Sequence, residues 1–127
     1  MEISFTDREL DVMAVLWRRG SGTVTEVREG LDDELAYTTV LTILRTLEEK
    51  GFVTHLAEGK AHRYQPAVTQ HAAGKSALAR LVDKVFAGSS EMLLAQLVSE
   101  RNLESAELKR LRKLLDDRLT KPKKRRS

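Results

Sequence analysis

The chain has 127 residues without a cysteine or a long apolar run, which excludes disulfides, cysteine catalysis and thiolate metal sites and leaves no candidate membrane span. With 41% hydrophobic, 32% charged and 5% aromatic residues, it is expected to be one helix-rich domain, or one domain with an appendage, around a Leu, Val and Ala core. The net charge of +3 divides unevenly, because residues 1–66 carry 8 Lys and Arg against 12 Asp and Glu, whereas residues 67–127 carry 14 against 7.

The first predicted helix begins with a capping box, Thr6-Asp7-Arg8-Glu9, and should run from Asp7 to about Arg19. Phe5 is placed to pack on Leu10 as a hydrophobic staple. Four residues share one face and are expected to enter the core: Leu10, Met13, Ala14 and Trp17. The tryptophan is therefore predicted to cover the core instead of binding a ligand or stacking on a base.

A second, shorter helix follows the break at Gly20-Ser21-Gly22. Thr23 and Glu26 form another capping box at its start. Val24, Val27 and Leu31 are spaced to bury one side of it. This segment is interpreted as the supporting helix that precedes a recognition helix.

Residues 36–50 predict a third, amphipathic helix. One stripe should be buried: Ala36, Val40, Ile43, Leu44 and Leu47. The opposite side carries short hydrogen-bonding groups and one guanidinium, flanked by Tyr37 and Leu41: Thr38, Thr42, Arg45 and Glu49. Such a face is suited to a DNA major groove. Gly51 is expected to end the helix, because glycine adopts left-handed backbone at low cost.

A two-stranded hairpin with a basic tip should come next. Strands are predicted at Phe52–Ala57 and Ala61–Gln65 around a Glu58-Gly59-Lys60 turn, with Pro66 closing the second strand. Three helices followed by a hairpin is the order of a winged helix-turn-helix, so residues 1–67 are predicted to be a DNA-binding domain. The acidic balance of this segment argues against DNA binding unless its carboxylates point away from the DNA.

Residues 68–120 predict a helical arm. Thr69 can cap a helix over Gln70–Phe86 that Gly88 ends, and further helices are expected near Glu91–Val98 and Ser105–Leu119. So small an arm buries its own leucines poorly, which favours pairing with an identical subunit over folding back on its own domain. The predicted dimer interface consists of Leu78, Leu81, Val82, Val85, Met92, Leu93, Leu97, Leu108, Leu111 and Leu115.

The last residues, 121–127, form a basic run that is expected to be a disordered tail. A second interpretation is a sequence-independent clamp on phosphates beside the binding site.

Over nearly its full length the chain resembles the penicillinase-repressor family of bacterial transcription factors, which includes the beta-lactamase, methicillin-resistance and copper-responsive repressors. The stretches that carry the resemblance are TDRELDVMAVLWRRG at 6–20, LAYTTVLTILRTLEEKGFVTH at 35–55 and EGKAHRYQPAV at 58–68. The resemblance implies a mainly α fold with a small β-hairpin wing and a C-terminal helical dimerisation arm. It also implies a homodimeric repressor that places one winged domain on each half-site of a palindromic operator.

Helix geometry and the resemblance together suggest specific DNA contacts. Thr38, Thr42 and Arg45 are expected to contact base edges, with Arg45 reading guanine. Tyr37 and Thr39, near the helix N-terminus, are expected to bind phosphate, as are Lys60 and Arg63 in the wing. For His62 a wing contact and a filling role in the hairpin both remain open, and Arg45 has the alternative of pairing with Glu49.

Differences from the family limit what the resemblance implies about induction. Its copper-responsive members carry paired cysteines near the C-terminus, and this chain has none, which argues against copper sensing of that kind. Its beta-lactam-responsive members are cut at an Asn-Phe bond in the dimer arm, so a signalling protease or sensor is a conceivable partner. The corresponding position here is Gln96-Leu97, and Asn102-Leu103 lies nearby, so no cleavage site is predicted.

Other classes of function receive less support. An enzyme would need a nucleophile beside a base, clustered metal ligands or a phosphate-binding glycine loop, and none is found, so neither catalysis nor a cofactor is expected. His55 and His62 could face each other across the hairpin, but two imidazoles make a poor metal site. The main alternative is a winged-helix module that binds protein without specific DNA binding. No signal peptide is recognised, and the cytoplasm is the expected location.

Overall fold

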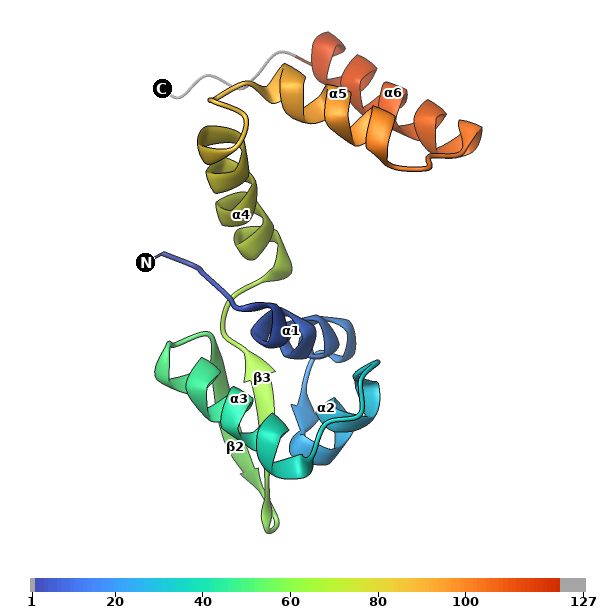
Figure 1. The fold of residues 1–127 in the computed structure, drawn as a ribbon. Helices are drawn as coiled ribbons and strands as arrows, with labels where there is room; N and C mark the ends of the chain where they lie inside the picture. Colours follow the sequence, from blue (N-terminus) through green and yellow to red (C-terminus); the bar gives the residue numbers. More distant parts are fainter. Residues whose placement is uncertain (1, 122–127) are drawn as a thin grey trace. The chain divides into compact units, whose positions relative to one another are not determined.

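The computed structural model describes residues 2–121 and is mainly helical with one small antiparallel sheet, as the sequence predicts. Its elements in chain order are α1 (Asp7–Arg19), β1 (Gly22–Thr23), α2 (Val24–Gly30), α3 (Tyr37–Glu49), β2 (Val53–Glu58), β3 (Ala61–Pro66), α4 (Gln70–Lys84), α5 (Ser90–Glu100) and α6 (Ser105–Thr120) (Figure 1). They form two compact units that divide between Leu81 and Val82, within α4. The basic run at 122–127 lies outside the described residues.

The first helix has the predicted bounds and the predicted capping box. The Thr6 hydroxyl accepts a hydrogen bond from the Glu9 amide at 3.1 Å, and the Glu9 carboxylate accepts one from the Thr6 amide at 2.8 Å. The second capping box, of Thr23 and Glu26, is also present and starts α2. Both helix starts are therefore satisfied by their own side chains.

The predicted core face of α1 is wrong in part. Leu10 and Ala14 are exposed, while the buried residues of the helix are Glu9, Val12, Met13, Val15 and Leu16. The six residues at 12–17 are all apolar, so helical spacing alone could not select the buried face.

Trp17 lies half-buried at the edge of the core and donates from Nε1 to the Val68 carbonyl at 2.9 Å. The staple also differs from the prediction, because the Phe5 ring packs against Trp17 and Phe52.

The third helix ends in a Schellman motif at Gly51. The Gly51 amide donates to the Glu48 carbonyl at 3.0 Å, and the Phe52 amide donates to the Leu47 carbonyl at 2.9 Å. Gly51 has φ +84°, the left-handed backbone that the sequence predicted for it. Because Leu47 and Phe52 are both buried, the turn anchors the start of the hairpin to the core.

The sheet has three strands in the order β1-β3-β2, one more than predicted. β2 and β3 form the expected hairpin with bounds shifted by one residue: Phe52 precedes β2, while Glu58 and Pro66 belong to the strands. The turn is therefore Gly59-Lys60, across which Glu58 pairs with Ala61. The added strand pairs Gly22 with Tyr64 and Thr23 with Arg63. Two residues are too few to show an alternating pattern, so β1 could not be recognised from the sequence.

The first unit encloses a core to which helices α1, α2 and α3 and the sheet all contribute. Its fully buried side chains are Val12, Met13, Leu16, Val27, Val40, Leu44, Leu47, Val53 and Tyr64. The unit continues past residue 67, where the sequence placed the domain boundary, into α4. Ser76 donates to the Ile3 carbonyl at 3.3 Å, and Arg80 pairs with Glu2 at 2.5 Å, so the first turns of α4 are held by the N-terminal segment.

The second unit consists of the end of α4 and helices α5 and α6. Helix α4 ends at Lys84, two residues before the predicted end, and the Gly88 amide donates to the Val82 carbonyl at 2.9 Å. Neither α5 nor α6 contains a buried residue. In the part of the chain that the structure describes, no helix combines the length and the hydrophobicity needed to cross a membrane.

Candidate nucleic-acid interface

The register of α3 determines which of its side chains face outward. Val40, Leu44 and Leu47 are fully buried and Ile43 is partly buried, so most of the predicted stripe is confirmed. Ala36 is exposed, because it is the N-cap residue and not part of the helix. The predicted groove face remains at the surface: Thr38, Thr42, Arg45 and Glu49 are all exposed. Within the first unit, the helix therefore presents a face of exposed polar side chains.

Two threonine hydroxyls of α3 bond to the helix itself. Thr42 Oγ1 donates to the Thr38 carbonyl at 2.9 Å, and Thr46 Oγ1 donates to the Thr42 carbonyl at 3.0 Å. A hydroxyl that gives its proton to the preceding turn keeps its lone pairs and its methyl group for other partners. Thr42 is thus set up to accept from a base amino group or to touch a thymine methyl, and not to donate.

The N-terminus of α3 differs from those of α1 and α2. Its N-cap, Ala36, makes no side-chain cap hydrogen bond, and its first turn contains no acidic residue. The first amides of the helix are therefore free of a side-chain acceptor and of a carboxylate that would repel an anion. Tyr37 and Thr39, the residues predicted to bind phosphate, are both exposed in this turn. Such a terminus is electrostatically suited to a phosphate group.

The wing is the β2–β3 hairpin, with its tip at Glu58–Ala61. Lys60 is exposed in the turn. His62 is also exposed, and its ring stacks on that of His55 with centroids 4.2 Å apart and an interplanar angle of 13°. His55 Nδ1 lies 2.6 Å from a carboxylate oxygen of Glu48, so the pair connects the hairpin to α3. The two roles left open for His62, wing contact and hairpin filler, are therefore compatible.

Arg63 is held inside the protein's own network. Its Nε and Nη2 atoms donate to the two carboxylate oxygens of Glu58 at 2.9 Å each. Its Nη1 atom donates to Glu26 at 2.9 Å and to the Ser21 hydroxyl at 3.2 Å. Sequence reasoning missed this network, although the hairpin register places Glu58 and Arg63 on one face of the ribbon as near neighbours.

Seven of the twelve acidic residues of the winged unit have a basic partner, which lessens the unfavourable charge balance of the sequence. Those with a cationic partner within 4 Å, or a histidine in the case of Glu48, are Glu2, Glu9, Asp11, Glu26, Asp33, Glu48 and Glu58. Within residues 2–121, Arg45 and Lys60 make no ion pair, and so the alternative of an Arg45–Glu49 pair is not seen. The unpaired cations of the α3 face and the wing tip are thus Arg45 and Lys60, two of the residues that the sequence predicts to contact DNA.

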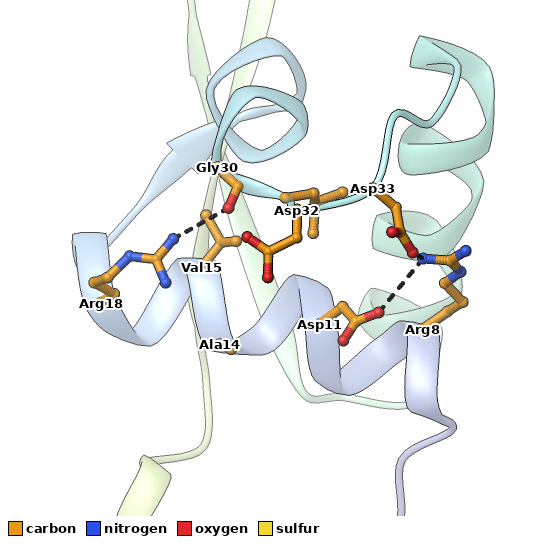
Figure 2. A pocket seen from close by; sticks show the side chains of 9 residues that line it. Arg8, Asp11, Ala14, Val15, Arg18, Gly30, Asp32 and Asp33 are labelled. Atoms are coloured by element: carbon orange, nitrogen blue, oxygen red, sulfur yellow. Dashed lines mark hydrogen bonds and ion pairs between the residues drawn. The ribbon is translucent and has the colours of Figure 1, made fainter.

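The acids before α3 partly face α1. A cleft of about 240 Å³ lies between α1 and the α2–α3 connection, with Asp32 and Asp33 on its rim (Figure 2). Arg8 donates to Asp33 at 2.7 Å and lies 3.5 Å from Asp11, and these partners raise the pKa of Arg8. Arg18 donates to the Gly30 carbonyl across the same cleft. This arrangement turns part of the negative charge toward α1 instead of the exposed face of α3.

The predicted dimer residues are found at the surface or only partly buried. The exposed ones are Leu78, Leu81, Val85, Met92, Leu97, Leu108 and Leu115, and the partly buried ones are Val82, Leu93 and Leu111. Leu94, Val98, Leu114 and Leu119 are exposed as well. So many exposed leucines and valines on short helices are typical of a surface that another molecule covers.

Comparison with known proteins identifies relatives. The model of the penicillinase repressor family matches residues 5–117. The transcriptional regulator BlaI of Mycobacterium tuberculosis is 44% identical over 63 residues, which cover 47% of this chain and only 46% of that regulator. The penicillinase repressor of Bacillus licheniformis is 23% identical over 93% of this chain and 94% of its own length, and the methicillin resistance regulatory protein MecI of Mammaliicoccus sciuri is 22% identical over 85% and 89%.

Solved structures agree with the fold. The DNA-binding domain of the repressor BlaI superimposes with a TM-score of 0.50 at 30% identity, covering 55% of this chain and 88% of that domain. The oxidised form of MarR from E. coli superimposes with a TM-score of 0.51 at 22% identity over 91% and 76% of the two chains, which bears on the fold alone. The family and the Bacillus licheniformis relative are described as penicillinase repressors, and the solved BlaI domain as the DNA-binding domain of a repressor, so the family is one of transcriptional repressors and not of enzymes. Because the family model covers nearly all of the chain, the protein belongs to the penicillinase-repressor family of winged-helix transcriptional regulators.

Proposed function

We propose that the protein is a cytoplasmic, homodimeric transcriptional repressor that binds a palindromic operator. One α3 enters the major groove of each half-site, about one helical turn (roughly 34 Å) apart, while the wing contacts the flanking backbone. The observation that carries the proposal is the position of the unpaired cations: Arg45 lies on the exposed face of α3, and Lys60 lies at the wing tip. Repression follows when the bound dimer blocks a promoter.

Each side chain at this surface has a specific task in the proposal. Arg45 donates to guanine, Thr38 and Thr42 contact neighbouring bases, and the first turn of α3, with Tyr37 and Thr39, binds a phosphate. Lys60 and His62 meet the backbone beside the groove. The leucine surface of α4, α5 and α6 holds the two copies together, which fixes the spacing of the half-sites.

Selection of binding sites from random double-stranded DNA with the purified protein tests the proposal. An inverted repeat should emerge, and its affinity should fall steeply with salt, with a log–log slope of about −0.9 for each phosphate contact. Lys60→Ala should reduce that slope by about 1 and leave the selected sequence unchanged. Weak binding without sequence preference at moderate ionic strength would reject the proposal.

A protein-binding winged helix is the second candidate. It would be favoured by the acidic balance of residues 1–66, the feature that most distinguishes this domain from basic DNA-binding domains. The same selection decides between the two candidates, because a protein-binding module would enrich no repeat and would show no dependence on Lys60.

A further inference from the structure

Arg63 has little donor capacity left for DNA. The guanidinium carries five N–H groups, and the contacts with Glu58, Glu26 and Ser21 occupy four of them. The pair with Glu58 is a two-pronged one, the geometry in which arginine and carboxylate bind most strongly. The side chain is only 29% exposed, which is low for a wing residue that reaches out to a phosphate.

The electrostatics around Arg63 also offer little attraction to an anion. Arg63 pairs with Glu58 and Glu26, and Arg19 lies 3.4 Å from Glu26. The hydrogen bond from Arg63 lowers the pKa of Glu58, while the Thr23 amide and then Arg63 lower that of Glu26. Both carboxylates are therefore charged at neutral pH, and they balance the two arginines, so no net positive charge is left here to attract a phosphate.

The position of the network in the fold suggests what it does. β1 pairs only with Arg63 and Tyr64, so the hairpin beyond this point continues as a two-stranded ribbon. An isolated ribbon is marginally stable and free to twist. Arg63 joins Glu58, the last residue of β2, to Glu26 in the first turn of α2. The network therefore spans the point where the ribbon leaves the three-stranded sheet.

We infer that Arg63 is a positioning residue whose pairing with Glu58 and Glu26 fixes the direction of the wing, so that Lys60, and not Arg63, meets the DNA backbone. The inference rests on the proposed function, because it assigns roles within the same DNA-binding surface. It reassigns the phosphate contact that the sequence suggested for Arg63. It also gives an acidic residue, Glu58, a favourable part in DNA binding.

Whether Glu58→Gln strengthens or weakens operator binding distinguishes a positioning role from the effect of charge alone. Glu58→Gln removes a negative charge from the wing, which by charge alone should strengthen DNA binding. If Glu58 holds Arg63 and the wing, the same change should weaken operator binding about three- to tenfold, the range for one lost contact. Glu29→Gln is the matched control, because Glu29 is an exposed carboxylate of α2 outside the proposed DNA surface and without an ion pair among residues 2–121, and its removal should leave binding equal or stronger.

Two further measurements complete the test. Arg63→Met should weaken binding to a similar degree, and the double variant Glu58→Gln/Arg63→Met should be no weaker than either single one, because both remove the same connection. In the protein without DNA, amide hydrogen exchange at residues 57–62 should become faster in each variant, with unchanged exchange in α1. Circular dichroism checks that the variants remain folded.

The outcomes are distinguishable. If Glu58→Gln binds the operator as strongly as the unmodified protein or more strongly, the positioning role is rejected. If the unmodified protein selects no repeat at all, the proposed function fails and the inference fails with it, whatever the exchange data show. Weaker binding by Glu58→Gln together with faster exchange at the wing supports the inference.

Discussion

The two compact units of the chain bury apolar residues to very different degrees. In the first unit, leucine and valine side chains of three helices and the sheet are fully buried, and the exposed face of α3 is polar. In the second unit, α5 and α6 are as rich in leucine but contain no buried residue. Similar composition therefore leads to a closed core in one unit and to an apolar surface in the other.

This contrast shows which part of the chain completes its fold alone. A winged unit with a closed core needs no partner for stability, so its exposed polar face remains available for DNA. A pair of amphipathic helices gains its stability by covering its apolar side. Mutations on the polar face of α3 are thus expected to leave dimerisation intact, whereas mutations of the leucine surface should separate the dimer and leave the winged unit folded.

The largest effect should come from opening the core of the first unit. Leu44→Ala removes a fully buried side chain of α3 and should lower the free energy of unfolding by about 2–5 kcal/mol. Leu56→Ala, at a residue 61% exposed in β2, should change it by less than about 0.5 kcal/mol. Urea denaturation followed by circular dichroism measures both. If the two variants lost the same free energy of unfolding, burial of a leucine would not predict its contribution to stability.

Mutation of the apolar surface of the second unit should weaken dimerisation and leave the fold of the first unit intact. Leu115→Asp introduces a charge at a half-exposed leucine of α6 and should weaken dimerisation by about 2 kcal/mol or more, because a charge in an apolar interface is left unpaired. Analytical ultracentrifugation should show monomers with an intact winged unit, and operator affinity should fall because each half-site is then bound separately. Lys109→Asp, at an exposed polar position of the same helix, is the control. A Leu115→Asp variant that sediments as a dimer would place the interface elsewhere.

Much of the first unit could be predicted from the sequence, because its signals are local. The capping boxes at Thr6 and Thr23, the left-handed Gly51 and the turn at Gly59-Lys60 each depend on a few neighbouring residues. The buried stripe of α3 followed from helical spacing alone. These features were sufficient to locate the recognition helix and the wing.

What the sequence could not show depends on contacts between distant residues. β1 exists only through pairing with β3, about forty positions further along the chain, and Arg63 reaches Glu26 across a similar separation. The apolar run at 12–17 left the buried face of α1 undetermined until the partners of that helix were known. The DNA-binding and dimer residues themselves remain predictions, since their partners are other molecules.

The polar face of α3 offers a smaller and more selective test. Arg45→Ala should cost about 1–3 kcal/mol of operator binding and relax base preference at one position of each half-site, without changing dimerisation or unfolding. Glu29→Ala, at an exposed residue of α2 outside this face, should not reduce affinity. Repeating the site selection with each variant measures the effect. An unchanged preference in Arg45→Ala would remove this residue from the base-reading surface.

The smallest expected effect concerns the one charged side chain that is buried among the described residues, Glu9. Burial raises its pKa, but the bonds from Lys50 and from the Thr6 amide outweigh burial and leave the pKa lowered from 4.5. A carboxylate whose pKa is lowered by folding stabilises the protein at pH values above its unfolded-state pKa, and this contribution is lost as the pH falls through its folded-state pKa.

Glu9→Gln should therefore be less stable than the unmodified protein by about 1 kcal/mol at pH 7, a modest loss because Lys50 is partly exposed. The difference in stability should shrink below pH 4.5. Urea denaturation of both proteins at pH 7 and at pH 3 checks this, with Asp7→Asn as an exposed control from the same helical turn. A difference that stays constant with pH would mean that the Glu9 charge does not help to join α1 to the end of α3.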